Sequence, residues 1–285
     1  MILVIGGTGN IGKTVVEGLL GKGEKVRILA RDTKTAVQVF QQAEVVQGDL
    51  DDPASLAQAT EGAEKLFLVT PLHLEQVRMK SNAIRAAKAA GIKHIVMSTG
   101  IGAGPDAGVE IGRWHGESQE EVKATGIPYT FLQPTFFMQN FMMSAPTIID
   151  HGAFYLPLGN GEVSFVDARD IADVAVTALT MPGYDNTELP ITGGQAITCG
   201  DAAEIMSEVL GKEIRFVDVT LDQAKEAMVG AGLPEKLADL MNELYALGPM
   251  GHLSYVAPTV ETTTGHKPRD FRRFLEDHAD AFRAE

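Results

Sequence analysis

The sequence has 285 residues, a formal net charge of −14 and one cysteine, Cys199. The acidic balance argues against a basic face that binds nucleic acid or an anionic membrane, and a single cysteine excludes an internal disulfide or a cysteine-cluster metal site. No apolar run reaches the roughly 18 residues of a membrane span, and because an apolar strand pattern stands at the start, we expect no signal peptide. We therefore expect a cytoplasmic protein with no membrane partner, no nucleic-acid partner and no metal.

The N-terminal residues predict a strand, a glycine turn and a helix. Residues 1–5 are apolar, glycines recur through residues 6–12, and an apolar helical pattern follows. Dinucleotide diphosphates bind at such a junction, because the backbone N–H groups and the positive end of the helix dipole favour an anion. The residues expected to contact a cofactor here are Gly6, Thr8, Gly9, Asn10, Ile11 and Gly12.

The same stretch also satisfies the P-loop pattern G-x-x-x-x-G-K-[ST], from Gly7 to Thr14. In that alternative Lys13 would reach the terminal phosphates of a nucleotide and Thr14 would bind magnesium. A P-loop protein should also have an apolar strand that ends in aspartate. The strand candidates at residues 65–71 and 94–99 do not end in aspartate. Residues 165–167 do, but they lie late in the chain. We therefore favour a dinucleotide site over an NTPase.

Strand and helix patterns alternate through the first half of the chain, which predicts an α/β fold with a Rossmann-type doubly wound parallel sheet. The expected strands are residues 25–30, 43–47, 65–71, 94–99 and 126–132. The expected helices are residues 33–42, 74–90 and 117–124, with a short helix after residue 53.

The second half mixes strand-like pieces with helices. The strand-like pieces are residues 163–166, 188–191 and 214–217, and the helices are residues 168–179, 201–210, 221–230 and 235–247. We expect residues 1–140 to form an NAD(P)-binding domain to which the chain returns around residues 160–180. Residues 141–285 should form mainly a smaller α/β substrate lobe.

The end of the second strand should select the cofactor. An arginine there pairs with the 2′-phosphate of NADP, whereas an acidic residue accepts the ribose 2′-OH of NAD. Arg31 occupies this position, and Asp32 heads a helical pattern in which its carboxylate suits an N-cap. The sequence therefore predicts NADP, with NADPH preferred. A solvated Arg31, or an Asp32 turned inward to bind NAD, stay open as alternatives.

Further cofactor contacts are expected where later strands end, because ligands of such sheets bind just outside the carboxyl ends of the strands. The alternative is that the serine and threonine hydroxyls at these strand ends serve only as helix caps. The residues expected in the site are Asp49, Leu50, Thr70, Pro71, Ser98, Pro134, Thr135 and Phe136.

Five motifs in chain order resemble the NmrA-like branch of the atypical short-chain dehydrogenase/reductases. They are the glycine turn, Arg31, residues 48–50 (GDL), residues 132–140 (LQPTFFMQN) and residues 166–172 (VDARDIA) followed by residues 192–193. Within the branch, the chain is similar to bacterial NAD(P)H:quinone oxidoreductases and triphenylmethane-dye reductases over nearly its whole length. The resemblance implies a Rossmann domain, a nicotinamide cofactor and a small C-terminal lobe over the substrate.

The sequence lacks the Tyr-x-x-x-Lys pair with which ordinary members of the superfamily move protons. None of its five tyrosines has lysine four residues later. Alcohol and ketone interconversion is therefore disfavoured, whereas the related quinone and dye reductases also lack the pair. The resemblance implies hydride transfer from NADPH to a flat aromatic acceptor such as a quinone, an azo dye or a triphenylmethane dye.

An aromatic and sulfur-rich run at residues 136–143 suits the binding of flat acceptors, although any one of its residues is more often part of a core. The expected substrate contacts are Trp114, Phe137, Asn140 and Phe141. His115 lies where the missing tyrosine would be, and its intrinsic pKa suits a proton donor. No catalytic side chain is assigned with certainty, and a structural His115 is the alternative.

Two other functions stay open at this point, the P-loop NTPase described above and a regulator. The branch also contains NADP-binding redox-sensing regulators that act without turnover, and sequence alone separates them poorly from reductases. The sequence does not decide the oligomeric state, and a homodimer is one possibility.

Overall fold

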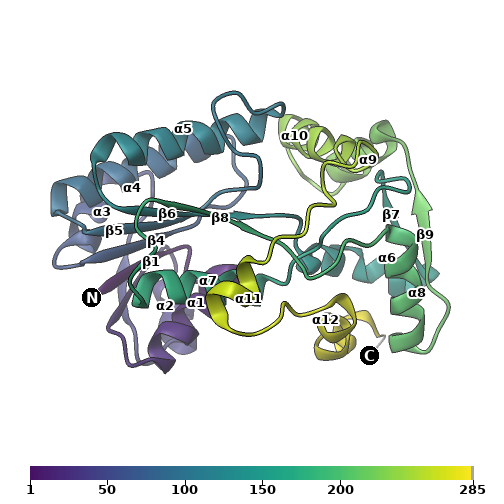
Figure 1. Cartoon of the computed structure of the whole chain (residues 1–285), viewed down its shortest axis with the longest axis horizontal. Helices are drawn as coiled ribbons and strands as arrows, with labels where there is room; N and C mark the ends of the chain where they lie inside the picture. Colours follow the sequence, from purple (N-terminus) through teal and green to yellow (C-terminus); the bar gives the residue numbers. More distant parts are fainter. Residues whose placement is uncertain (284–285) are drawn as a thin grey trace. The chain divides into compact units, whose positions relative to one another are not determined.

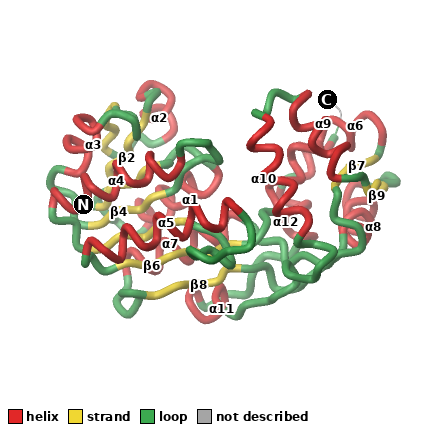
Figure 2. Tube along the Cα trace, turned by 90° about the horizontal axis from the view of Figure 1, so that it is seen from above, coloured by secondary structure: helices red, strands yellow, loops and turns green. Residues whose placement is uncertain are grey.

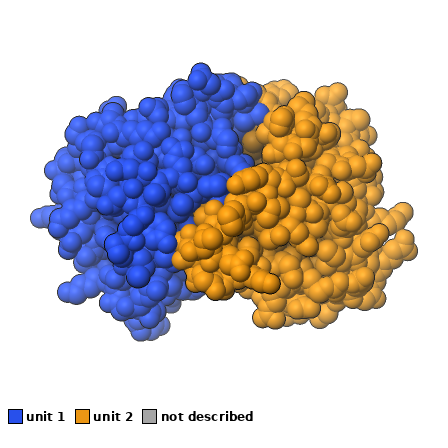
Figure 3. All heavy atoms as spheres, viewed as in Figure 1, with its two compact units in different colours: residues 1–134, 171–190 blue, residues 135–170, 191–285 orange. Residues whose placement is uncertain are grey.

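The computed structural model describes residues 1–283. The chain divides into two compact units (Figure 3). Unit 1 comprises Met1–Pro134 and Ile171–Pro190, and unit 2 comprises Thr135–Asp170 and the chain from Ile191 onward. Within residues 1–283, no helix combines the length and apolar character needed to cross a membrane.

Unit 1 is built on a seven-stranded sheet. Its strands are β1 (Ile2–Ile5), β2 (Val26–Ala30), β3 (Glu44–Gln47), β4 (Lys65–Leu68), β5 (His94–Ser98), β6 (Tyr129–Pro134) and β8 (Thr187–Ile191). They lie in the order β3-β2-β1-β4-β5-β6-β8, and the pairs from β3 through β6 are parallel. The strand order reverses between β1 and β4, which is the point at which doubly wound sheets bind nucleotides.

Helices cover both faces of this sheet. One face carries α3 (Pro53–Thr60), α4 (Gln76–Ala90) and α5 (Glu110–Thr125), and the other carries α1 (Asn10–Gly21), α2 (Thr33–Val39) and α7 (Ala168–Thr180) (Figure 1). Two covered faces require strands that are apolar throughout, and all of β1 is buried. Close packing is visible at Gly18, where an added Cβ would lie 2.9 Å from Val176 of α7. The fold of unit 1 is therefore a Rossmann-type doubly wound sheet.

Unit 2 has a small two-stranded parallel sheet of β7 (Ala153–Leu156) and β9 (Arg215–Asp218), which lie side by side (Figure 2). Its core includes Phe154, Phe271 and Phe274, all at most 1% exposed. The elements of unit 2 are η1 (Met138–Ser144), α6 (Ala145–His151), β7 (Ala153–Leu156), α8 (Cys199–Leu210), β9 (Arg215–Asp218), α9 (Leu221–Gly230), α10 (Glu235–Ala246), α11 (Thr259–Thr264), α12 (Phe271–Asp277) and η2 (Ala279–Phe282).

Two predicted elements differ from the structure. Residues 163–166 do not form a strand; they make isolated bridges, Val163 with Ile197 and Val166 with Phe137. The helix predicted at residues 117–124 is much longer, because α5 begins at Glu110 and runs through two glycines that resemble breakers. A Cβ on Gly116 would lie 2.3 Å from the backbone of Gly104, so glycine lets the preceding loop pack directly on the helix.

Candidate active site

The glycine turn after β1 is shaped by close backbone approach. Gly6 has φ +85°, and a Cβ there would lie 2.5 Å from the carbonyl oxygen of Val69 at the end of β4. A Cβ on Gly12 would lie 2.0 Å from the carbonyl oxygen of Gly6. Only glycine fits these two positions, and together they bring the turn and the first turn of α1 against the end of the neighbouring strand.

The N-terminus of α1 is free to bind an anion. The helix has Gly9 as its N-cap, with no capping side chain and no acidic residue in its first turn. The first N–H groups of the helix therefore keep their partial positive charge. Thr8 and Asn10 are exposed beside them, whereas the side chain of Ile11, the second residue of the helix, is buried. This cradle fits a dinucleotide diphosphate.

The structure also decides between the two patterns that overlap in this stretch. α1 begins at Asn10, so Lys13 and Thr14 lie beyond the first three helical residues, whose N–H groups are free to bind an anion. The N–H of Lys13 donates to the carbonyl oxygen of Gly9 at 2.9 Å, and its side chain is 55% exposed beside Glu17. A P-loop needs these backbone N–H groups for the phosphates, so the P-loop alternative is excluded.

Arg31 and Asp32, which follow β2, have different environments. The Asp32 carboxylate accepts hydrogen bonds from the backbone N–H groups of Lys34 and Thr35 and from the Thr35 hydroxyl. These bonds lower the pKa of Asp32, the Thr35 side chain contributing most. Asp32 is thus the N-cap of α2, and it is not turned inward toward a ribose. Arg31 is exposed at the same strand end.

The neighbouring strand ends hold the other predicted cofactor residues of unit 1. The N–H of Gly48 donates to the carbonyl oxygen of Ala30, which brings Asp49 and Leu50 next to Arg31. The Asp49 carboxylate accepts from the N–H of Asp51.

The ends of β4 and β5 add two hydroxyls. Ser98 is the buried last residue of β5. Thr70 and Pro71 follow β4, and the Thr70 hydroxyl oxygen is buried without a hydrogen-bond partner among residues 1–283. An unpaired buried hydroxyl at this strand end fits a bound ribose or nicotinamide that would supply the partner.

The segment after β6 leads into unit 2. Pro134 ends β6, and its carbonyl oxygen accepts from the N–H of Ile101. Thr135 is held on both sides: its N–H donates to Ile191 and its hydroxyl donates to the carbonyl oxygen of Ser164. These bonds fix the backbone just before the aromatic run.

The aromatic residues of this run divide into two groups. Phe136 stacks on Tyr245 with ring centroids 5.7 Å apart, and Phe137 is half-buried. Asn140 is exposed in η1. Phe141, in contrast, is only 2% exposed and packs against Phe154, Phe165 and Phe271. The prediction that Phe141 contacts substrate therefore loses its support, because the ring is enclosed in the core of unit 2.

α5 carries the remaining predicted residues, Trp114 and His115, and both are half-buried. Nδ1 of His115 lies 2.8 Å from Nζ of Lys80 in α4, a residue that sequence analysis missed. The sequence held one signal: Lys80 falls on the apolar face of its helix, four residues before the buried Ile84. Nothing in the sequence, however, pairs it with a residue 35 positions away.

A polar network in unit 2 holds the start of α7. Asp167 is fully buried and accepts from the side chains of Arg169 and Gln139. Arg169 also pairs with Asp277 of α12 at 2.6 Å. Although burial alone would raise the pKa of the Asp167 carboxyl, these hydrogen bonds hold it below its usual value. The network gives the acidic and basic residues of this motif a structural role.

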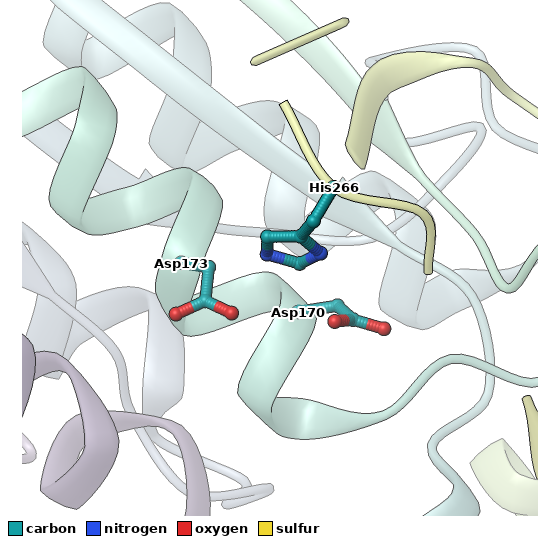
Figure 4. Close-up of side chains that lie close together, drawn as sticks. All are labelled: Asp170, Asp173 and His266. Atoms are coloured by element: carbon teal, nitrogen blue, oxygen red, sulfur yellow. The ribbon is translucent and has the colours of Figure 1, made fainter. Parts of the chain in front are cut away.

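Asp170, Asp173 and His266 are the group among residues 1–283 whose side chains could hold a metal ion. Asp170 and Asp173 are one turn apart on α7, and His266 lies near Asp170 (Figure 4). Asp170, however, already forms an ion pair with Arg269 and accepts from the N–H of the same residue. The arrangement is explained by that pairing, and we assign no metal to it.

Comparisons with known proteins agree with this geometry. The NmrA-like family profile matches residues 1–275. The chain is 50% identical over 285 residues, the whole of both chains, to the NAD(P)H azoreductase of Xenophilus azovorans. The NADPH complex of an NADPH-dependent quinone oxidoreductase from Escherichia coli has a TM-score of 0.89 at 26% identity, covering 98% of this chain and 100% of that one. The NADP(H) complex of the Citrobacter sp. triphenylmethane reductase has a TM-score of 0.86 at 27% identity, covering 97% and 99%. This chain therefore belongs to the NmrA-like family.

Proposed function

We propose that this protein uses NADPH to reduce flat, electron-poor aromatic acceptors, with azo dyes, quinones and triphenylmethane dyes as the substrate class. The observation that carries the proposal is the 50% identity to an NAD(P)H azoreductase along the entire length of both chains. The chain is accordingly an NAD(P)H-dependent oxidoreductase, and unit 1 is its cofactor-binding part. We assign the substrate-binding role mainly to unit 2.

The residues of unit 1 fit NADP. The glycine turn and the open N-terminus of α1 would hold the diphosphate, and Arg31 would pair with the 2′-phosphate. The unpaired Thr70 hydroxyl would hydrogen-bond near the reactive end. When bound, NADPH supplies the hydride; the protein's own part is to hold the acceptor in place and to exclude competing reactions.

The proposed acceptor contacts of unit 2 are Phe137 and Asn140, and the one of unit 1 is Trp114; Phe136 stays a proposed cofactor contact. Half-buried aromatic side chains present flat apolar faces to a planar ligand. Phe141 is left out of this set because its ring is enclosed in a core. A triphenylmethane cation becomes neutral on gaining hydride alone, so its reduction needs no side-chain acid, in agreement with the missing Tyr-x-x-x-Lys pair.

Deuterium transfer tests direct hydride chemistry. The enzyme is supplied with NADPH deuterated at the transferred hydrogen and with malachite green, whose reduced central carbon does not exchange hydrogen with water. We expect one deuterium in the colourless product, detected by mass spectrometry. A product that carries only solvent hydrogen would contradict direct transfer, and an unreduced dye together with tight NADPH binding would favour a redox-sensing regulator.

A further inference from the structure

A buried lysine and a histidine contact each other between two helices of unit 1. Lys80 in α4 is only 1% exposed, and its Nζ atom lies 2.8 Å from Nδ1 of His115 in α5. Within the described residues 1–283, neither side chain forms an ion pair with a carboxylate. An ammonium group buried against one uncharged partner is unfavourable for folding, so a functional explanation is needed.

His115 faces the edge of the sheet at which β5 ends. Its Cδ2 atom is 3.7 Å from the point where a Cβ would stand on Gly100, and Gly100 comes two residues after the end of β5 at Ser98. One turn further along α5, the Gln119 amide donates to the Thr99 hydroxyl. Because ligands of parallel sheets bind beside this edge, the imidazole lies on the side of unit 1 where a reacting molecule would be held.

While Lys80 is charged, its contact with His115 fixes the position of the ring proton. A protonated lysine has no lone pair, so Nδ1 of His115 must accept from it and the ring proton lies on Nε2. Nε2 itself has no hydrogen-bond partner in the part of the chain that the structure describes. Among the described residues, the ring therefore has an unpaired Nε2–H donor, while its Nδ1 atom accepts a hydrogen bond from the Lys80 ammonium.

The environment makes Lys80 an unusually strong acid. Burial lowers the pKa of Lys80 to about 7. Burial, and then the charge of Lys80, hold the pKa of His115 well below its usual value. Of the acidic side chains further along α5, Glu120 pairs with Lys123, Glu121 contacts Ser81 and Arg85, and Glu117 is exposed.

We propose that His115 donates its Nε2 proton to the reduced acceptor while Nδ1 takes a proton from Lys80. The inference rests on the proposed reductase function. The Nε2–H bond breaks as an N–H or O–H bond forms on the acceptor, and the Nζ–H bond breaks as the Nδ1–H bond forms. Lys80 is left as a neutral amine, and the starting state returns when Nε2 takes a proton from water as Nδ1 gives its proton back to Nζ. The ring stays neutral throughout, and His115 is the donor while Lys80 is a positioning residue that acts through it.

The acceptor classes differ in their need for this proton. A triphenylmethane cation needs hydride alone. An azo group that has gained hydride on one nitrogen develops a strongly basic anion on the other, whereas a quinone gives a phenolate that water can protonate later. The proposal therefore predicts that losing the pair slows azo reduction most, quinone reduction modestly and triphenylmethane reduction least.

The first test compares kcat for an azo dye and for malachite green in His115→Ala and Lys80→Met, with Lys88→Met as the control. Lys88 is an exposed lysine two turns further along α4. We expect azo kcat to fall about 100-fold or more in His115→Ala and about tenfold or more in Lys80→Met, with losses well under tenfold for malachite green. The control should match the unmutated enzyme with both dyes.

The outcomes separate the two claims. Equal losses with both dyes would mean that the pair only supports the fold, and an unchanged azo rate in His115→Ala would equally overturn the proposal. An unmutated enzyme that reduces none of the acceptors would instead overturn the proposed function, and the proton relay with it.

A second readout is independent of turnover. Nitrogen NMR of the histidine rings distinguishes the two tautomers in the NADPH-free protein, and the His115 signals are assigned by their loss in His115→Ala. We expect the Nε2-protonated tautomer in the unmutated protein and in Lys88→Met, and a tautomer mixture in Lys80→Met. A ring protonated on Nδ1 in the unmutated protein would overturn the relay.

Discussion

The carbonyl oxygen of Gly6 lies 2.0 Å from the point where a Cβ atom would stand on Gly12. An alanine at residue 12 cannot be accommodated unless the backbone of the turn moves. We expect Gly12→Ala to destabilise the protein by about 1 to 3 kcal/mol or more and to weaken NADPH binding severely. Thermal unfolding and fluorescence titration with NADPH measure the two effects.

Gly21, in the last turn of the same helix, provides the matched control. A Cβ there meets nothing within 4 Å. Gly21→Ala should leave NADPH affinity unchanged and stabilise the helix by up to about 1 kcal/mol. Similar NADPH affinities for the residue 12 and residue 21 variants would show that the turn does not hold the diphosphate.

Arg31→Ala should remove the preference for NADPH over NADH. A charge-assisted contact with the 2′-phosphate contributes about 1.5 to 3 kcal/mol, which corresponds to roughly tenfold to a hundredfold in Kd. NADH affinity should hardly change, because NADH has no phosphate at that position. Calorimetric Kd values for both cofactors check the prediction.

Asp32→Ala separates cofactor choice from helix capping at the adjacent residue. Asp32 caps α2, so its loss should cost about 1 kcal/mol of stability and leave the NADPH preference intact. If instead Asp32→Ala altered the cofactor preference and Arg31→Ala did not, the assignment of the two residues would have to be exchanged.

Phe137→Ala and Phe141→Ala should have opposite signatures. Phe141 is enclosed by three aromatic rings, so its truncation should lower the free energy of unfolding by about 3 to 5 kcal/mol. Phe137 is half-buried, and its truncation should chiefly raise KM for the dye, as should Trp114→Ala. Chemical unfolding curves and steady-state kinetics separate the two; a KM effect confined to Phe141→Ala would reverse the assignment.

Lys80 should make the stability of the protein depend on pH in a defined window. Its folded-state pKa of about 7 lies below the ordinary 10.5, so between these values the unfolded chain binds a proton that the folded protein does not. The free energy of unfolding therefore increases as the pH rises through this window and decreases as the pH falls.

Lys80→Met removes this dependence. The stability advantage of Lys80→Met over the unmutated protein should shrink by roughly 2 kcal/mol from pH 7 to pH 9, measured by urea unfolding at each pH. Lys88→Met should show no such change. A constant difference between Lys80→Met and the unmutated protein would mean that Lys80 is charged in the folded state across the window.

The sequence was most informative where local chemistry decides the structure. The apolar strand, glycine turn and helix at the N-terminus follow directly from residue type, and Asp32 caps α2 as its position before a helical pattern predicts. The pattern from Gly7 to Thr14 was ambiguous, because two motifs share its glycines and lysine. The start of α1 at Asn10 resolved it.

Other features depend on contacts between distant parts of the chain. Residues 163–166 alternate like a strand, yet Val163 and Val166 pair with different segments and form isolated bridges. The short elements α6 and β7 had no clear periodicity. Phe137 and Phe141 have the same side chain four positions apart, and packing alone makes one half-buried and the other a core residue. The contact between Lys80 and His115 joins two helices, so no local pattern reveals it.

The most direct test of the account is the consumption of NADPH, followed by its absorbance, with a panel of azo dyes, quinones and triphenylmethane dyes. We predict acceptor-dependent oxidation of NADPH that is faster than oxidation of NADH. The loss of dye colour should be proportional to the NADPH consumed. Tight binding of NADPH without oxidation by any acceptor in the panel would contradict the account and identify the protein as a sensor of its cofactor.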